Sequence, residues 1–209
     1  MTRSRLSRVY LILAGVALVS LACASSAAAQ SAASPGRVAL SGTVGVFVPS
    51  NTAMSDVYGS RLMPVTAQVD VRVVPDVALF GGIRWMSADG QAVVLGTPVV
   101  NETSTTSLGV TAFRVGAEVA RAVAPRWTLA GGAGIVIARY EETWPDAGRA
   151  VNNHSSGFLV LAEARCAVGG KWSVIGRVEY ASVRANVADE SGAVNLGGVD
   201  ASAGVRFVF

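Results

Sequence analysis

The stretch Val65-Thr-Ala-Gln-Val-Asp-Val-Arg-Val73 alternates between apolar and polar side chains without a break. Its odd positions carry Val or Ala, and its even positions carry Thr, Gln, Asp and Arg. Successive side chains of a β-strand point to opposite faces of the sheet. The stretch therefore predicts a strand with one apolar face and one polar face.

The same alternation recurs along the rest of the chain. The predicted strands are residues 37–48, 65–73, 77–87, 106–121, 127–140, 157–168, 172–183 and 199–209. Three connections between them are short (74–76, 124–126 and 169–171), and four are long (49–64, 88–105, 141–156 and 184–196). Each strand is about as long as a tilted membrane crossing requires. An even number of strands with alternating short and long connections is typical of transmembrane barrels, whose short turns face the periplasm.

The first 29 residues have the pattern of a cleavable signal peptide. Arg3, Arg5 and Arg8 precede an apolar run over residues 9–22, and small residues follow up to Ala29. This order predicts export and cleavage after Ala29, which leaves a short segment at 30–36 and a barrel domain at 37–209. Two alternatives remain open. The apolar run is short for an uncleaved anchor helix, and a lipoprotein signal at Cys23 lacks the usual Leu three residues earlier.

The charge and cysteine content exclude several classes of function. The chain has 17 Lys and Arg against 14 Asp and Glu, and the first 29 residues hold three arginines and no acidic residue. The exported chain is therefore neutral, so we expect no nucleic-acid partner. It retains one cysteine, Cys166, and one histidine, too few for a metal cluster. The sequence has no glycine-rich phosphate loop, so we predict no cofactor, metal or catalytic residue.

Eleven charged side chains occupy the polar faces of the predicted strands. They are Asp70, Arg72, Arg84, Arg114, Glu118, Glu163, Arg165, Arg177, Glu179, Asp200 and Arg206. A soluble β-sandwich would expose these charges to water, whereas a membrane barrel encloses them and turns its aliphatic face to lipid. The export signal, the rhythm of the connections and the apolar C-terminus favour the barrel. We therefore predict an all-β, eight-stranded, antiparallel up-and-down transmembrane barrel with a charged lumen that its side chains fill.

Aromatic residues occur near both ends of the predicted strands. Trp127 and Trp172 follow short turns, whereas Trp85, Tyr140 and Tyr180 lie near the opposite ends of their strands. Transmembrane barrels carry aromatic girdles at both membrane interfaces. We predict that these five residues form the two girdles.

With its export signal, eight amphipathic strands and apolar C-terminal end, the chain resembles the small outer-membrane barrels of the OmpA/OmpX and opacity-protein type. The terminal sequence Val205-Arg-Phe207-Val-Phe209 is part of that resemblance. In such proteins, a final aromatic residue preceded by apolar residues at alternate positions is the signal read by the barrel-assembly machinery. The resemblance implies that Val205, Phe207 and Phe209 form this signal. It also implies contact with outer-membrane lipid and lipopolysaccharide in a Gram-negative envelope.

Three functions follow from this resemblance. The first is a structural or surface-interaction role, in which the long loops contact a surface ligand. The second is a small porin for ions or apolar solutes, as in OmpW-like barrels. The third is lipid A deacylation, because His154 and Ser156 resemble the His-x-Ser pair of PagL-like barrels, although Gly157 stands where that family has Asn. We expect the first role and no enzymatic activity.

Overall fold

The computed structural model describes residues 37–95, 101–145, 148–185 and 194–209. The predicted signal peptide and the segment 30–36 lie outside these residues. The described elements are β1 (Val38–Pro49), α2 (Thr52–Tyr58), β2 (Val65–Val74), β3 (Val77–Leu95), β4 (Asn101–Ala124), β5 (Trp127–Trp144), β6 (Arg149–Gly169), β7 (Trp172–Ala185), β8 (Val194–Asn195) and β9 (Gly198–Val208). Within the described ranges, no helix has the length and hydrophobicity needed to cross a membrane.

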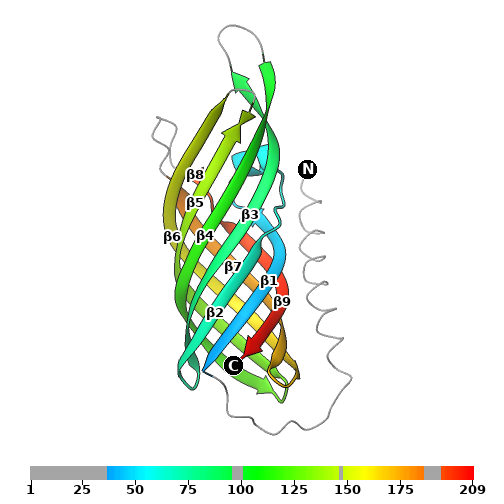
Figure 1. Ribbon diagram of the computed structural model, residues 1–209, viewed down its shortest axis with the longest axis vertical. Helices are drawn as coiled ribbons and strands as arrows, with labels where there is room; N and C mark the ends of the chain where they lie inside the picture. Colours follow the sequence, from blue (N-terminus) through cyan, green and yellow to red (C-terminus); the bar gives the residue numbers. More distant parts are fainter. Residues whose placement is uncertain (1–36, 96–100, 146–147, 186–193) are drawn as a thin grey trace.

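The eight long strands close into an antiparallel ring (Figure 1). Neighbours in sequence pair with one another from β1 to β7, and β9 pairs with both β7 and β1. The closing ladder between β1 and β9 runs from Ala39 opposite Val208 to Pro49 opposite Gly198. The two-residue strand β8 adds only a short pairing to the end of β7. A closed sheet leaves no unpaired edge, so the predicted barrel topology is confirmed.

The three short connections are two-residue turns at one end of the barrel. They are Pro75-Asp76, Pro125-Arg126 and Gly170-Lys171. Each turn is preceded by a register shift in the strand before it, as in the bulge between Arg72 and Val74. Gly170 has a φ of 54°, a left-handed conformation that glycine adopts without a steric penalty. The short connections are therefore confirmed.

Two of the four predicted long loops are mostly strand. β3 and β4 pair as far as Leu95 opposite Asn101, and β5 and β6 pair as far as Trp144 opposite Arg149. The four strands of these hairpins are 18 to 24 residues long, whereas a membrane crossing takes about 9–11. The sequence analysis assigns these segments to loops because they lack the regular apolar–polar alternation of the membrane-crossing strands. A strand segment that lies outside the membrane can have polar residues on both faces, and it then shows no alternation of apolar and polar residues.

The predicted loop at 49–64 contains the helix α2. The Asn51 side chain caps its first turn by accepting a hydrogen bond from the Ala53 amide at 2.9 Å. Gly59, with a φ of 89°, ends the helix. The helix lies at the long-connection end of the barrel, beside β1 and β3 (Figure 1).

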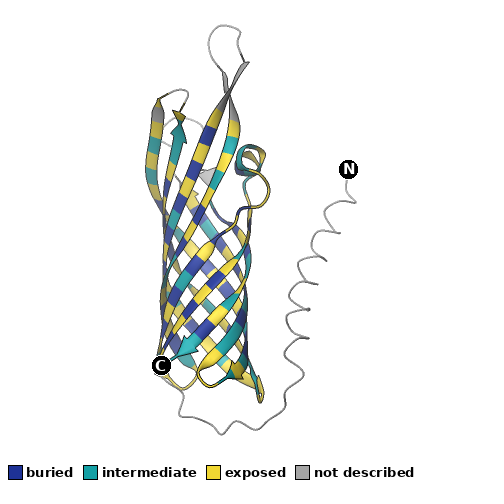
Figure 2. Cartoon of the chain, turned by 45° about the vertical axis from the view of Figure 1, so that its right-hand side comes forward, coloured by how far each residue is buried: buried dark blue, intermediate teal, exposed yellow. Residues whose placement is uncertain are grey.

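Burial alternates residue by residue along the barrel wall (Figure 2). The outward face carries Val44, Ile135 and Phe158, which are 51–57% exposed, whereas the inward Glu118 and Glu179 are each 1% exposed. Each large apolar side chain left in water forgoes roughly 1.5–3 kcal/mol of transfer free energy. A continuous belt of such residues is therefore stable only against an apolar medium, which lipid supplies.

Candidate functional site

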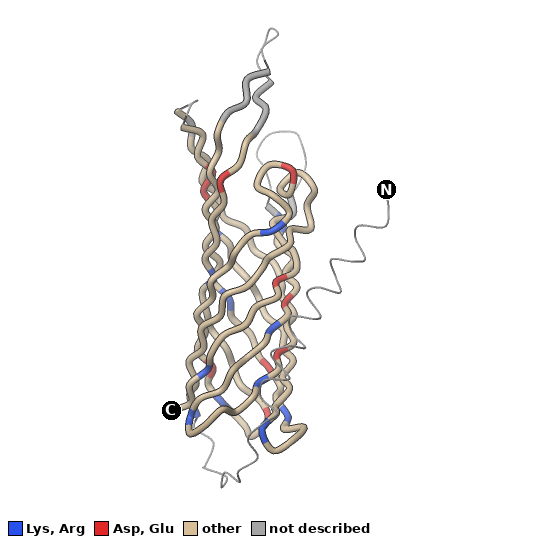
Figure 3. The backbone as a smooth tube through the Cα atoms, turned by 90° about the vertical axis from the view of Figure 1, so that its right-hand side faces the viewer, with Lys and Arg blue, Asp and Glu red and all other residues tan. Residues whose placement is uncertain are grey.

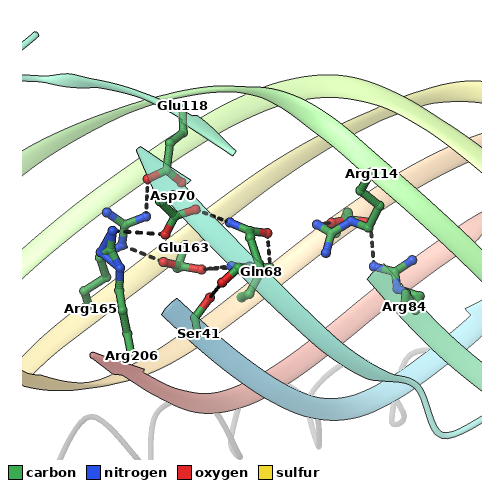
Figure 4. Close-up of polar contacts among 11 residues, drawn as sticks. Ser41, Gln68, Asp70, Arg84, Arg114, Glu118, Glu163, Arg165 and Arg206 are labelled. Atoms are coloured by element: carbon green, nitrogen blue, oxygen red, sulfur yellow. Dashed lines mark hydrogen bonds and ion pairs between the residues drawn. The ribbon is translucent and has the colours of Figure 1, made fainter. Parts of the chain in front are cut away.

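The barrel interior gathers ten of the eleven predicted lumen charges. All ten are at most 8% exposed, because they occupy the inward positions of the strand alternation. The exception is Arg72, which is half-buried and lines a cavity at the short-turn end. The buried charges form two groups at different heights, each linked by ion pairs (Figure 4).

The group nearer the short turns is a chain of seven side chains across the lumen. Glu163 accepts from Arg165 Nε at 2.5 Å and from Arg177 Nε at 2.7 Å. From Arg165 the chain continues to Glu118, at 2.5 Å. From Arg177 it continues to Gln68 Oε1, at 2.9 Å, while Gln68 Nε2 donates to Asp70 at 2.7 Å. Asp70 then pairs with Arg206 at 3.0 Å. These residues come from β2, β4, β6, β7 and β9.

The second group lies further from the short turns and centres on Glu179. Its carboxylate accepts from Arg84 at 2.5 Å and from Arg114. Arg84 also lies 3.5 Å from Asp200. Arg84 is on β3 and Glu179 on β7, which are opposite each other in the ring of long strands. This ion pair therefore crosses the full diameter of the barrel.

The interior beyond Glu179 is mostly apolar, which the sequence analysis did not predict. Phe80, which pairs with Asp70 across the strands, and Leu161, opposite Glu179, extend this apolar core down to the level of the ion pairs. The buried apolar side chains are Phe47, Met54, Leu62, Phe80, Met86, Leu108, Val110, Ala112, Val136, Ala138, Tyr140, Leu159, Leu161, Ala181 and Val183. Strand parity already places Leu108 and Val110 on the inward face, which they share with Arg114. The prediction missed this apolar core because it assigned the lumen from charged residues alone. It also missed Gln68, an uncharged residue on the same polar face as Asp70.

The helix α2 covers the apolar core at the long-connection end. Met54 is 6% exposed and packs in that core. The Tyr58 hydroxyl donates to Glu142 on β5 and lies 3.0 Å from the hydroxyl of Thr106 on β4. Burial and this bond to Glu142 raise the pKa of Tyr58 above its usual value, so the phenol stays protonated. At Gly90, an added Cβ would lie 2.9 Å from the Tyr58 ring, so the close approach of helix and strand needs glycine.

One of the five residues predicted for the aromatic girdles lies inside the barrel. Tyr140 is 8% exposed and belongs to the apolar core, so its assignment to a girdle is wrong. The physical reason is strand parity, because the outward positions beside it on β5 are Arg139 and Glu141. Trp85, Trp172 and Tyr180 are 39–51% exposed on the outer face, and Trp127 is half-buried beside a short turn.

The predicted assembly signal lies on the closing strand β9. The rings of Phe207 and Trp172 pack at a tilt of 59° with centroids 4.8 Å apart, and the Phe209 ring packs edge-on against Phe207 at 4.9 Å. The Phe209 amide donates to Val38 of β1 at 2.9 Å. Phe209 and Val205 are each more than half exposed on the outer face.

His154 and Ser156 lie within β6 rather than in a loop, and both face outward. Neither the His154 imidazole nor the Ser156 hydroxyl has a hydrogen-bond partner among the described residues. The cross-strand neighbour of His154 is Arg139, a cation rather than a carboxylate. Activation of Ser156 needs its hydroxyl to bond to a histidine base, and the described geometry does not provide that bond.

Cys166 is 3% exposed, although strand parity places it on the outward face of β6. It pairs across the strands with Trp127 and Val174.

Among the described residues, no group of His, Cys, Asp and Glu has the arrangement of a metal site. The interior therefore offers two layers of ion pairs below a capped apolar core.

The solved structures that resemble this fold include small outer-membrane barrels. Neisserial surface protein A (NspA) matches with a TM-score of 0.60 and 14% identity, over 85% of this chain and 100% of that one. The N-terminal β-barrel domain of Pseudomonas aeruginosa OprF matches with a TM-score of 0.52 and 10% identity, over 84% of this chain and 99% of that one. At such low identity, these likenesses concern the fold alone.

Sequence comparison adds the family. No curated protein matches this chain. The family model described as outer membrane protein beta-barrel domain matches residues 14–207, which include every described strand except the last residue of β9. The chain is therefore a member of the outer membrane protein β-barrel family.

Proposed function

We propose that this protein is a structural barrel with a blocked lumen, which presents its tall β3–β6 sheet as a contact surface outside the outer membrane. One observation carries this proposal. The outward face of these strands changes from apolar to polar partway along their length. On β5, the exposed Ile135 and Ile137 give way to the exposed Arg139 and Glu141. On β6, Phe158 gives way to Ser156.

The length of the hairpins supports the same proposal. Strand β4 has 24 residues, about 13 more than a crossing uses. At about 3.3 Å per residue, the excess corresponds to roughly 40 Å along the strand. The apolar belt ends near Phe113, so the excess lies on the side of the long connections, which face away from the periplasm in barrels of this kind.

Cysteine labelling in intact cells tests this placement. Ser107→Cys lies on the outward face of β4 above the belt, and Val115→Cys lies on the same face within it. A membrane-impermeant maleimide should label Ser107→Cys in intact cells and should leave Val115→Cys unlabelled. Asp76→Cys, at a short turn, should react only after the outer membrane is permeabilised. Labelling of Asp76→Cys but not Ser107→Cys in intact cells would reverse the proposed orientation.

A narrow ion path is the second candidate, and a specific observation favours it. The Nε and Nη1 atoms of Arg114 and the Nε atom of Arg84 are buried without hydrogen-bond partners in the described structure. Buried polar groups of this kind usually bind ordered water, so water would stand beside the Glu179 ion pairs. Conduction would still require a route through the apolar core and past α2. Bilayer recording separates the two candidates.

For lipid A deacylation, mass spectrometry of lipid A gives a direct test. We expect the acyl composition to be the same with and without expression of the protein, and the same for Ser156→Ala. Loss of an acyl chain that Ser156→Ala abolishes would establish the enzyme instead.

A further inference from the structure

A cavity of about 340 Å³ opens at the short-turn end of the barrel, below the chain of seven side chains. Its charged lining comprises five arginines and three acidic residues: Arg37, Arg72, Arg126, Arg165, Arg206, Asp70, Asp76 and Glu118. Small side chains such as Ala39, Ala78 and Ala120 line the rest and leave the space open. Figure 3 shows the basic positions gathered at this end of the barrel.

The ion pairs leave this cavity with excess positive charge. Glu118 pairs with Arg165, and Asp70 pairs with Arg206. Among the described residues, the guanidinium groups of Arg37 and Arg72 have no carboxylate within ion-pair distance. The lining as a whole has two more arginines than carboxylates, and a concave site with an excess of one sign of charge concentrates ligands of the opposite sign.

Arg206 supplies a hydrogen-bond donor that the protein itself does not use. Its side chain is 10% exposed, and one terminal nitrogen, Nη2, lies 3.0 Å from Asp70. Its Nε atom is buried and has no hydrogen-bond partner in the described structure. An unpaired buried donor on a charged group destabilises the folded protein, so the Arg206 guanidinium is incompletely compensated by Asp70. The terminal nitrogen Nη1 is not among the buried unpaired atoms, so it is the donor of Arg206 that a ligand in the cavity can reach.

We propose that this cavity binds a small, doubly charged oxyanion of the phosphate class from the periplasmic side. Guanidinium groups are planar and present paired N–H donors, which match two oxygens of a phosphate at once. Arg72 at the cavity wall and Arg206 at its inner end would contact the anion. The chain of seven side chains closes the cavity above, so the site holds its ligand without passing it through the barrel. This inference is independent of the proposed role of the tall hairpins.

Isothermal titration with inorganic phosphate tests the site. The full protein is extracted from outer membranes in zwitterionic detergent and titrated at pH 7.5 in low salt. We expect saturable binding at one site per chain. Arg72→Gln should weaken the binding roughly tenfold, equivalent to about 1.4 kcal/mol. Arg72 has no ion pair to lose, so this variant should fold, and its heat-modifiable gel migration checks that it does.

Arg121→Gln is the matched control. Arg121 is exposed on the outward face of β4 at the same end of the barrel and does not line the cavity. This variant should bind phosphate as the unchanged protein does. Equal weakening in both variants would show a diffuse charge effect and overturn the proposal, as would the absence of saturable binding. Malonate, a dicarboxylate, distinguishes the ligand class, because binding of malonate without phosphate would also overturn it.

Discussion

Single residues hold the interior together, and Glu179 is the best example. It is 1% exposed and accepts hydrogen bonds from both Arg84 and Arg114. Arg114 therefore depends on this one carboxylate for its compensating charge, whereas Arg84 also lies 3.5 Å from Asp200. Removing one partner of a buried ion pair leaves the other charge uncompensated, which costs more than the pair itself contributes.

We predict that Glu179→Gln lowers the free energy of unfolding by about 3–5 kcal/mol, the usual cost of breaking a buried pair. Urea unfolding in detergent, followed by tryptophan fluorescence, measures the change. Glu141→Gln is the control, because Glu141 is exposed on the outward face of β5, and it should change stability by less than about 0.5 kcal/mol. Equal stability of the two variants would mean that the charges across the lumen are not coupled.

Tyr58 fastens α2 to the barrel wall through Glu142. Its raised pKa has a definite consequence for stability. A group whose pKa is raised by folding contributes stability that is present below its unfolded-state pKa and lost as the pH rises through its folded-state pKa. The contact should therefore hold at neutral pH and weaken only in strongly alkaline solution.

Tyr58→Phe removes the hydroxyl and keeps the ring. Because the bond is only part-buried, we expect a local loss of about 1 kcal/mol. Hydrogen exchange of the α2 amides should then be roughly fivefold faster. Tyr180→Phe, an exposed change on the outer face, should leave α2 exchange unaltered. Unchanged exchange in Tyr58→Phe would show that α2 is held without this bond.

Among the strands, β9 has two roles, because it closes the ring and carries the predicted assembly signal. Deleting Phe209 removes one ring contact and one backbone hydrogen bond to Val38. We predict that the deletion impairs insertion in cells but permits refolding into lipid vesicles in vitro. Heat-modifiable bands from membrane fractions and from vesicles measure the two outcomes.

The control for this experiment is Phe158→Ala, which removes an exposed aromatic residue from the middle of β6. It should insert normally in cells. If the Phe209 deletion also inserts normally, the terminal residue is not the signal that the resemblance implies.

The predicted strands were most accurate where the outer face of the barrel wall contacts lipid and its inner face carries charged side chains. There the two faces of a strand differ most, as in β2, and Asp70 and Arg206 were placed correctly. The prediction failed where the two faces of a strand have similar polarity. The polar run 101–105 falls in the predicted loop 88–105, because strands outside the membrane have polar residues on both faces. Tyr140 was assigned by its position along the strand, although its parity pointed inward.

The apolar core inside the barrel was not predicted, for a related reason. Leu108 and Val110 are chemically like the lipid-facing residues of the same strand, and only their parity separates them. Signals for α2 were present in Asn51 and Gly59, but a helix of seven residues is too short for an apolar periodicity to establish. The pairing of particular charges could not be predicted, because it depends on which strands face each other across the ring.

At the scale of the whole molecule, side chains cross or fill the barrel interior at three levels. A chain of seven side chains crosses the lumen near the short turns, the Glu179 ion pairs span it further along, and the apolar core with α2 fills the remaining part. An ion crossing this interior would lose its hydration against ion pairs that are already compensated, and then against aliphatic side chains. These three levels support the proposal that the barrel is blocked to ions.

Single-channel recording in planar lipid bilayers tests that claim most directly. The folded protein, verified by its heat-modifiable migration, is added to a bilayer bathed in concentrated potassium chloride. The structure predicts no conductance steps, or rare steps far below a nanosiemens. Stable steps of nanosiemens size would contradict it.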